Sequence, residues 1–339
     1  MSLDQEDQDV FELPEFPMPF QARVNPHLDM LHRRSESWAR ATGMLSGGGY
    51  PDSWAIWDSL PTFHAIAAPE LTAYCWPAAP PAEAALIHDA MIWYFAFDDH
   101  FQHRYKLSMD IDGVREHLVR LPAFMPMTSD EPMPSPENAV EEGLADLWPR
   151  LIRSRPTRWR RAWKDGITRF CDSAIQETVH LSTGRVLDLV EYVQLRRETF
   201  GAYTAALYVD ISTGVMIPEK IREIREIQVL LDAFMDYMSL INDVFSYERE
   251  IDHEGCVTNL VLVVKNFLGV PLRQAVRIAN DLVGARLRQF EYTLKVELPE
   301  ASARLNLNDA ERASLAAWGE GAQDYLSGIL AWHERAARY

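Results

Sequence analysis

The sequence predicts one all-α domain, and two observations support this class. No stretch shows the alternation of apolar and polar residues with period two that marks a half-buried strand. The chain of 339 residues also lacks internal repeats and any low-complexity linker, and 47% of its residues are hydrophobic. That fraction is ample for one sizeable core. We therefore expect an extended leader over residues 1–25 and a single helical domain over residues 26–339.

Prolines and glycines divide the first hundred residues into short elements. The leader is acidic and becomes apolar near its end. Asn25-Pro26 predicts the start of a helix that runs to about Thr42, because proline fits the first helical position. A break at residues 47–51 follows, then short helical pieces as far as Tyr74, a proline-rich break at 77–81, and a long helix from about Glu83.

The remaining chain has the pattern of longer helices around one loop. Five prolines lie between residues 122 and 136, together with Ser, Thr and Asp, and this composition predicts a surface loop. Helices are expected at residues 137–153, 157–182, 187–213, 218–252, 268–296 and 308–338.

Net charge and cysteine content exclude several classes of function. The formal net charge is −17, which argues against a nucleic-acid partner and against stable association with an anionic membrane. A polyanionic substrate would need local arginines and metal ions to bind in this field. The three cysteines lack the spacing of a zinc site or a disulfide framework. The N-terminus lacks a signal-peptide pattern and no apolar run approaches about 18 residues, so we expect a cytoplasmic protein.

Asn242, Ser246 and Glu250 form the most informative pattern. Each lies four positions after the one before, so on a helix the three side chains share one face. An amide oxygen, a hydroxyl and a carboxylate are oxygen donors of the kind that Mg²⁺ binds, usually together with substrate phosphates. Arg249 lies about 20° from the same stripe, where a guanidinium suits a diphosphate. The alternative is a solvated polar face on an amphipathic helix.

A second acidic patch, Asp98-Asp99, ends a strongly aromatic run. Buried aspartate is rare unless it is paired or bound to metal. Asp98 shares its helix face with Met91, Tyr94 and Phe95, so an apolar wall leads to a carboxylate. The helix face before Asn242 has the same arrangement, in which the apolar residues Leu231, Met235 and Met238 lead to a polar end. The alternative is that both aspartates face water, but two such helices together favour an apolar cavity with a charged mouth.

With these two patterns the chain resembles the bacterial class I terpene synthases, whose all-α bundle surrounds one central hydrophobic cavity. That family carries an aspartate-rich motif on one helix and an Asn-Asp-x-x-Ser-x-x-x-Glu motif on the facing one. The likeness extends to the germacradienol-forming N-terminal domain of geosmin synthases and covers nearly the whole chain. It is carried by residues 11–16, 25–27, 97–101, 143–150 and 242–250.

The first motif departs from the family pattern. The family usually has a further acidic residue three to five positions after the first aspartate, where this chain has Phe101, Gln102 and His103. The resemblance therefore implies a secondary role for Asp99. His103 could ligate a metal when neutral, but a solvated helix histidine is the expected state. Three Mg²⁺ ions are expected with bound diphosphate, on the ligands Asp98, Asn242, Ser246 and Glu250.

The resemblance also implies a diphosphate-sensing arginine 46 residues before Asn242, which is Arg196. Arg197 follows it and is the second choice. Guanidinium groups pair bidentately with phosphate oxygens, so a doubled arginine suits this role. Phe200 and Gly201 come next and are expected to act with the arginine in catalysis. Gly201 would allow a break in the helix and free a carbonyl to face the cavity.

The C-terminal residues Arg338 and Tyr339 resemble the Arg-Tyr pair with which the family seals the diphosphate. Upstream, aromatic residues recur every seven positions, a stripe that is either plain core or, at Trp332, part of the cavity. Tyr94 and Phe95 are expected to line the same cavity. Their faces would stabilise a carbocation by about 2 kcal/mol where water is excluded.

The sequence thus predicts a Mg²⁺-dependent cyclase that ionises farnesyl diphosphate and closes the allylic cation into a sesquiterpene. The product would be germacrane-type or derived from it, and an alcohol where water quenches the cation. The alternatives are a diterpene cyclase acting on geranylgeranyl diphosphate and a non-catalytic relic that serves as a helical binding module. A chain-elongating prenyltransferase is disfavoured, because those enzymes repeat the aspartate-rich motif. The expected partner is the isoprenyl diphosphate substrate, and the resemblance also allows a homodimer.

Overall fold

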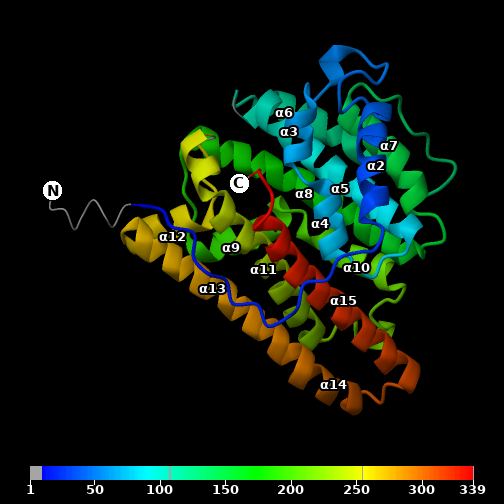
Figure 1. Cartoon of the computed structure of the whole chain (residues 1–339), viewed down its shortest axis with the longest axis vertical. Coiled ribbons are helices and arrows are strands. Elements are labelled where there is room, and N and C mark those ends of the chain that lie inside the picture. Colours follow the sequence, from blue (N-terminus) through cyan, green and yellow to red (C-terminus); the bar gives the residue numbers. More distant parts are fainter. Residues whose placement is uncertain (1–9, 107, 254, 339) are drawn as a thin grey trace.

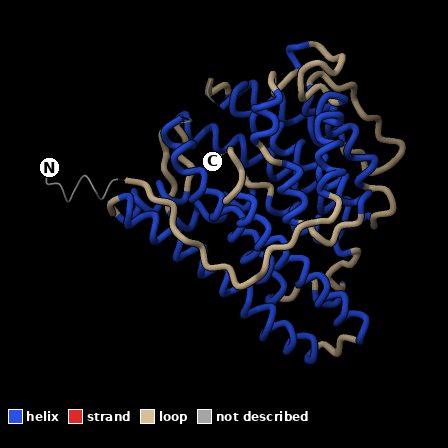
Figure 2. Tube along the Cα trace, in the orientation of Figure 1, coloured by secondary structure: helices blue, strands red, loops and turns tan. Residues whose placement is uncertain are grey.

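The computed structural model describes residues 10–106, 108–253 and 255–338, and helices joined by loops make up this part of the chain (Figure 1, Figure 2). No strand occurs among the described residues, where Leu45 and Trp57 form an isolated β-bridge. The predicted all-α class is confirmed. The helices are α2 (Leu28–Ala41), α3 (Leu60–Ala65), α4 (Ala68–Cys75), α5 (Pro81–Phe101), α6 (Ile111–Arg120), α7 (Ala139–Leu151), α8 (Thr157–Thr183), α9 (Leu189–Thr199), α10 (Ala202–Thr213), α11 (Arg225–Glu248), α12 (Leu260–Leu268), α13 (Leu272–Tyr292), α14 (Leu298–Arg304) and α15 (Asp309–His333).

The main differences from the predicted elements are short helices and helix ends. The sequence did not predict α6, α12 or α14, which have 10, 9 and 7 residues. Local capping explains α12, since the Asn259 side chain accepts a hydrogen bond from the Val261 amide at 2.9 Å. The helix expected over 308–338 ends at His333. The helix expected over 187–213 is divided into α9 and α10 at Gly201, which has φ +66°.

The two helices with the acidic motifs both continue into π-helical turns. Gln102–Lys106 follows α5, and Arg249–His253 follows α11. The wider turn, with hydrogen bonds from i to i+5, rotates the side chains away from their positions on a regular α-helix. Glu250, the last residue of the second motif, therefore lies in a π-helical turn, whereas Asp98 and Asp99 lie in the last turn of α5.

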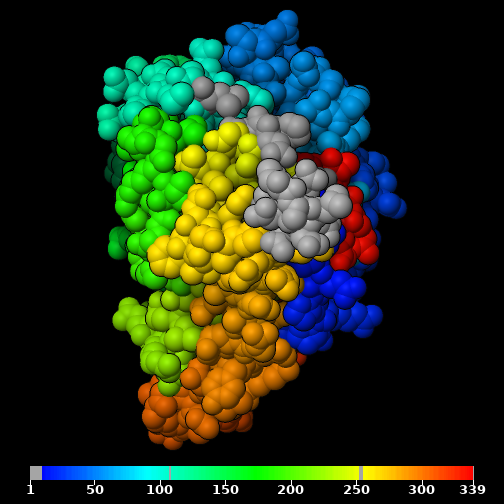
Figure 3. Space-filling view, turned by 90° about the vertical axis from the view of Figure 1, so that its left-hand side faces the viewer, coloured from blue at the N-terminus to red at the C-terminus, as the bar shows by residue number. Residues whose placement is uncertain are grey.

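Helices α11, α13 and α15 are crossed by the described part of the N-terminal segment, residues 10–25 (blue in Figure 1). Asn280 of α13 donates a hydrogen bond to the Glu15 carbonyl at 2.9 Å, and Arg23 pairs with Asp324 of α15. Phe16 stacks on Phe245 of α11 with ring centroids 5.1 Å apart. The space-filling view shows the blue N-terminal segment and the red C-terminal residues on the same side of the molecule (Figure 3).

Tryptophans fill much of the core between α5, α7 and α8. Trp93 and Trp148 are fully buried, and their indole N–H groups donate to the carbonyls of Val140 and Pro126, each at 2.8 Å. Pairing of these polar atoms makes their burial favourable. None of the described helices combines the length and apolar character that a membrane span requires.

Candidate active site

A cavity of about 180 Å³ lies among α4, α5, α8, α9, α10, α11 and α15. One set of its lining residues is mostly apolar and aromatic, and we call this set the apolar wall: Met91, Tyr94, Phe95, Phe170, Phe200, Tyr208, Met238 and Trp332. A second set is charged or polar, and we call it the polar end: Asp98, Arg196, Asn242, Ser246, Arg249, Glu250 and Arg338. The cavity thus combines a hydrophobic surface with a concentration of oxygen donors and guanidinium groups.

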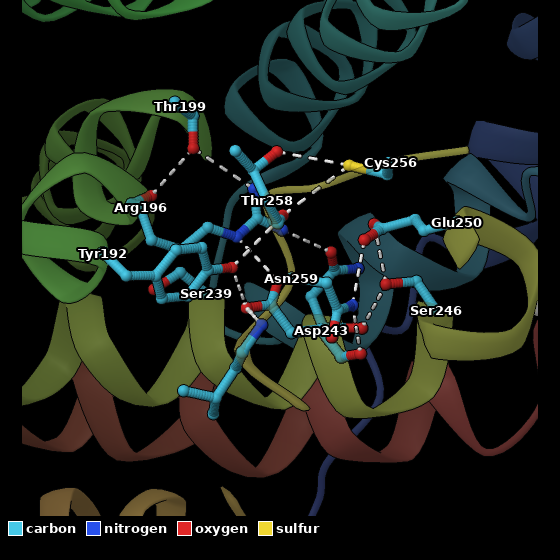
Figure 4. A network of polar contacts seen from close by, with 12 residues as sticks. Tyr192, Arg196, Thr199, Ser239, Asp243, Ser246, Glu250, Cys256, Thr258 and Asn259 are labelled. Atoms are coloured by element: carbon cyan, nitrogen blue, oxygen red, sulfur yellow. Dashed lines mark hydrogen bonds and ion pairs between the residues drawn. The ribbon is translucent and has the colours of Figure 1, made fainter. Parts of the chain in front are cut away.

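Asn242, Ser246 and Glu250 lie together at the C-terminal end of α11, as Figure 4 shows for Ser246 and Glu250. The Ser246 hydroxyl donates to Glu250 Oε1 at 2.8 Å. Asn259 Nδ2, at the start of α12, donates to Glu250 Oε2 at 3.0 Å. Both carboxylate oxygens of Glu250 are therefore held by hydrogen bonds.

Glu250 occupies a site where a carboxylate charge is unfavourable. Burial and the neighbouring charge of Asp243 raise the pKa of Glu250 to about 7, although Arg196, Asn259 and Ser246 oppose the shift. A buried carboxylate is stabilised by a cation placed against it. The polar end therefore favours a positive ligand at this point.

His333 fixes the orientation of the Asn242 amide. Its Nδ1 lies 2.8 Å from the Ile329 carbonyl, which can only accept, so Nδ1 carries the proton. Nε2 is then the acceptor for Asn242 Nδ2 at 3.1 Å. Burial lowers the pKa of His333 to about 3, which keeps the ring neutral. The amide oxygen consequently faces Arg196, whose Nη2 donates to it at 2.9 Å.

Arg196 and Asp243 form a buried ion pair beside the cavity (Figure 4). Arg196 Nε donates to Asp243 Oδ1 at 2.7 Å. Asp243 also accepts from the Tyr192 hydroxyl and from the Leu260 amide, the latter at 3.0 Å. Burial would lower the pKa of Arg196, but the Asp243 carboxylate more than compensates and raises it. The guanidinium is thereby held charged, with one edge toward the cavity.

Arg197, the second choice from the sequence, lies outside the cavity lining. Its Nη2 donates to Asp236 Oδ2 at 3.0 Å, and its Nη1 lies 3.0 Å from Asp232 Oδ1. Asp236 is almost fully buried and also pairs with Arg286. Arg197 therefore joins α9 to α11 in an ion-pair network.

The two aspartates of the first motif have different surroundings. The Asp98 side chain lines the cavity and is 65% exposed, with Arg338 Nη2 at 3.4 Å. Asp99 is buried and accepts from Arg338 Nη2 at 2.7 Å and from Trp57 Nε1 at 2.8 Å. Burial opposes ionisation of Asp99, yet the Arg338 guanidinium holds its pKa below the usual value. Asp99 thus anchors Arg338, and Asp98 faces the cavity.

Phe200 and Gly201 line the cavity at the break between α9 and α10. The Gly201 carbonyl accepts a hydrogen bond from the Thr204 hydroxyl at 2.8 Å. The predicted break in the helix is therefore present at Gly201, and Thr204 lies in the first turn of α10. The Tyr94 hydroxyl bonds to Thr204 in turn, so the break positions a tyrosine of the apolar wall.

The remaining predicted residues lie around Arg338. Its guanidinium carbon lies 5.1 Å from the Phe95 ring centroid, and Phe95 and Trp332 have centroids 5.9 Å apart. Both aromatic side chains line the cavity. Tyr339 lies outside the described residues. His103 is exposed and does not line the cavity.

Several cavity residues were not predicted from the sequence. The π-helical turn after α5 adds Gln102 and Lys106, and the segment before α12 adds Cys256 and Thr258. Glu177 of α8 accepts from the Thr258 hydroxyl at 3.0 Å. Gln102, Lys106, Cys256 and Thr258 come from irregular turns and loops, and Glu177 comes from α8, so no motif spacing indicated them. Asp243, which pairs with Arg196 beside the cavity, did have a signal, because it stands inside the motif from Asn242 to Glu250.

The donor set of the polar end fits a divalent cation. Within the described residues, no group of three or more His, Cys, Asp or Glu side chains is placed to hold a metal by itself. Asn242, Ser246 and Glu250 instead contribute amide, hydroxyl and carboxylate oxygens to one cavity, with Asp98 lining it as well. Such oxygen sets bind hard cations, which are completed by water or substrate phosphate.

Comparisons with known proteins agree with this geometry. Residues 89–289 match the family described as terpene synthase family 2, C-terminal metal binding. Pristinol synthase of Streptomyces pristinaespiralis is 24% identical over 95% of this chain and 83% of its own length. Pentalenene synthase of Streptomyces avermitilis is 25% identical over 96% of this chain and 92% of its own length. The crystal structure of germacradien-4-ol synthase from Streptomyces citricolor superposes with a TM-score of 0.81 at 22% identity, covering 95% of this chain and 100% of that one.

The family match spans more than half of the chain, which therefore belongs to terpene synthase family 2. The protein is a class I terpene synthase similar to bacterial enzymes and uses a divalent metal. The enzyme prediction is confirmed.

Proposed function

We propose that the protein is a Mg²⁺-dependent sesquiterpene cyclase that converts farnesyl diphosphate into a germacrane-type or derived product. The supporting observation is the division of one cavity into an apolar wall and a polar end. The wall suits a prenyl chain, and the polar end suits a diphosphate and its metal ions. The preference for farnesyl over geranylgeranyl diphosphate, and for a germacrane, rests on the sequence resemblance.

The polar end would bind and orient the diphosphate. Asp98 from one side and Asn242, Ser246 and Glu250 from the other would hold Mg²⁺, three ions as the resemblance implies. When bound, Mg²⁺ acts as a Lewis acid that makes diphosphate a better leaving group. Arg196, Arg249 and Arg338 would contact the phosphate oxygens through charge-assisted hydrogen bonds.

The apolar wall would control the allylic cation after the C–O bond breaks. Aromatic faces attract cations, and the residues that line the cavity include Tyr94, Phe95 and Trp332, which would stabilise the allylic cation. Their packing also excludes water, which delays quenching until the ring has closed. Phe200 and Gly201 lie next to Arg196 in the fold. A diphosphate bound by Arg196 would therefore also influence the shape of the apolar wall.

Product analysis tests the proposed function. Purified protein is incubated with Mg²⁺ and, in separate reactions, geranyl, farnesyl and geranylgeranyl diphosphate, and the extracts are analysed by GC-MS. We expect a cyclic C15 product from farnesyl diphosphate that disappears with EDTA. A cyclic product from geranylgeranyl diphosphate alone would establish the diterpene alternative, and no product from any substrate would overturn the proposal.

A matched pair of variants tests the metal ligands. Asn242→Ala should lower kcat/KM at least about 100-fold, because a ligand oxygen is lost from the polar end. Asn280→Ala is the control. Asn280 lies on α13 away from the cavity and donates a hydrogen bond to the Glu15 carbonyl. Equal turnover of both variants, with equal helicity by circular dichroism, would contradict the assignment of Asn242.

A further inference from the structure

The π-helical turn after α5 places two polar side chains in the cavity. Gln102 and Lys106 are four residues apart, and both line the cavity together with Asp98, Arg249 and Glu250. They extend the polar end by an amide and an ammonium group on the α5 side. Neither belongs to the ligand sets that the two motifs define.

Lys106 differs from the arginines of the polar end in its partner. Arg196 is paired with Asp243, and Arg338 with Asp98 and Asp99. The contact of Lys106 Nζ within the described part of the chain is with the thiol sulfur of Cys256, at 3.9 Å. An ammonium has three N–H donors, and a thiol is a weak acceptor. Lys106 can therefore accept an anion without breaking an ion pair.

The Lys106 ammonium keeps its charge in this position. Burial opposes the charge, but the neighbouring groups more than compensate and raise the pKa of Lys106; they are Cys256, Glu177, Asp98 and Glu250. Carboxylates from α5, α8 and the end of α11 thus surround the ammonium without closing an ion pair. Burial raises the pKa of the Cys256 thiol, and the Lys106 ammonium opposes that shift.

Gln102 supplies an independent observation that points to a ligand. The side chain is 7% exposed, and its Nε2 has no hydrogen-bond partner among the described residues. A buried amide N–H without an acceptor costs about 1–3 kcal/mol in the folded state. Gln102 lines the cavity, so the unpaired donor belongs to a side chain beside the space that a ligand would occupy.

We propose that Gln102 and Lys106 form a diphosphate-binding subsite on the α5 side of the cavity. The inference rests on the proposed function, since it assumes a diphosphate-bearing substrate. The Lys106 ammonium binds a phosphate oxygen as a point charge, and the Gln102 amide donates a second hydrogen bond. The first motif lacks a further acidic residue and hence a further metal ligand. At this point the subsite supplies positive charge to the diphosphate from Lys106.

Calorimetric titration with inorganic diphosphate in the presence of Mg²⁺ tests the subsite without turnover. Lys106→Gln should bind diphosphate about 10- to 100-fold more weakly than the wild type, because one charge-assisted contact is lost. Lys220→Gln is the control for net charge, because Lys220 is an exposed lysine that pairs with Glu311 outside the cavity. KM for farnesyl diphosphate should also rise for Lys106→Gln, and it should not change for Lys220→Gln.

Gln102→Leu keeps the test informative if Lys106→Gln fails to fold. It removes a buried donor that has no partner in the described part of the chain, so Tm should stay equal or rise while diphosphate affinity falls several-fold. Unchanged diphosphate affinity in folded Lys106→Gln, or in Gln102→Leu, would overturn the subsite and leave the proposed function standing. Failure of the wild type to bind diphosphate would instead overturn the proposed function.

Discussion

At the scale of single residues, Arg196 and Arg197 show why adjacent side chains of one type can have different roles. They are neighbours on α9, so their side chains point about 100° apart. Arg196 reaches the cavity and shares its donors between Asp243 and Asn242, whereas Arg197 pairs with Asp232 and Asp236. The first arrangement leaves a guanidinium edge on the cavity surface, and the second connects two helices.

Conservative substitutions should separate these roles. Arg196→Lys keeps the charge but cannot span Asp243 and Asn242, so we expect kcat/KM to fall about 100-fold. Arg197→Lys should leave kcat/KM within about twofold and lower the free energy of unfolding by about 1 kcal/mol, since a bidentate pair with buried Asp236 is weakened. Steady-state kinetics and urea unfolding of both variants provide the measurements. A greater loss of activity in Arg197→Lys would identify Arg197 as the diphosphate contact.

The residues of the site divide clearly into those that a sequence can predict and those that it cannot. Asn242, Ser246 and Glu250 follow from the 3.6-residue period, and all three line the cavity. His333 and Asn259 hold Asn242 and Glu250 from distant segments, so no local spacing indicates them. These supporting contacts depend on how α11, α12 and α15 pack.

At the scale of elements, irregular backbone places much of the polar end. A pattern built on regular helices predicted the start of α5 within two residues (83 against 81) and placed the start of α11 seven residues early (218 against 225). It could not predict the π-helical turns that follow the two helices. Lys106 lies eight residues after Asp98, about 80° away on a regular α-helix. The wider turn changes that angle, which explains why spacing alone did not reveal Lys106 as a cavity residue.

The break between α9 and α10 is an element whose role can be tested with a matched glycine. Gly201 and Gly214 have φ of +66° and +70°, a region that costs other residues about 1–2 kcal/mol. A Cβ at Gly201 would lie 3.0 Å from Tyr94 Cε1, whereas a Cβ at Gly214 meets no atom within 4 Å. Both alanine variants should lose stability by a similar amount. Only Gly201→Ala should move Tyr94 and change the products.

Urea unfolding and GC-MS of the products measure the two effects separately. The comparison removes backbone strain as an explanation, since both glycines carry it. If Gly214→Ala altered the product profile as much as Gly201→Ala, the break would act through stability rather than through the apolar wall.

At the scale of the whole molecule, the described N-terminal segment and the end of α15 meet at α11. Phe16 stacks on Phe245 with centroids 5.1 Å apart, and His333 stacks on the same residue at 4.9 Å. On the helix Phe245 lies about 60° from Asn242 and about 100° from Ser246. His333, which stacks on Phe245, also accepts from Asn242 Nδ2. Packing from both ends of the chain therefore supports α11 beside the proposed metal ligands.

Packing between α10 and α15 gives the molecule a pH-dependent stability. Trp318 of α15 donates to Asp210 Oδ1 of α10 at 2.9 Å, and both side chains are buried. Burial raises the pKa of Asp210 to about 7, well above the value near 3.9 in an unfolded chain. Between these two values the folded protein keeps a proton that the unfolded chain releases. The contribution of Asp210 to stability therefore falls as pH rises from about 4 to about 7.

Asp210→Asn should remove this dependence, because an amide does not titrate and its oxygen can still accept from Trp318. Relative to the wild type, the free energy of unfolding of Asp210→Asn should rise by on the order of 1 kcal/mol per pH unit between pH 4 and 7, and then stay constant. Urea unfolding at several pH values measures the difference between the two proteins, so groups common to both cancel. Asp309→Asn is the control, since the Asp309 side chain is fully exposed and its difference from the wild type should be flat. A flat difference for Asp210→Asn as well would mean that the buried carboxyl is ionised in the folded state, held by the nearby arginines, of which Arg222 contributes most.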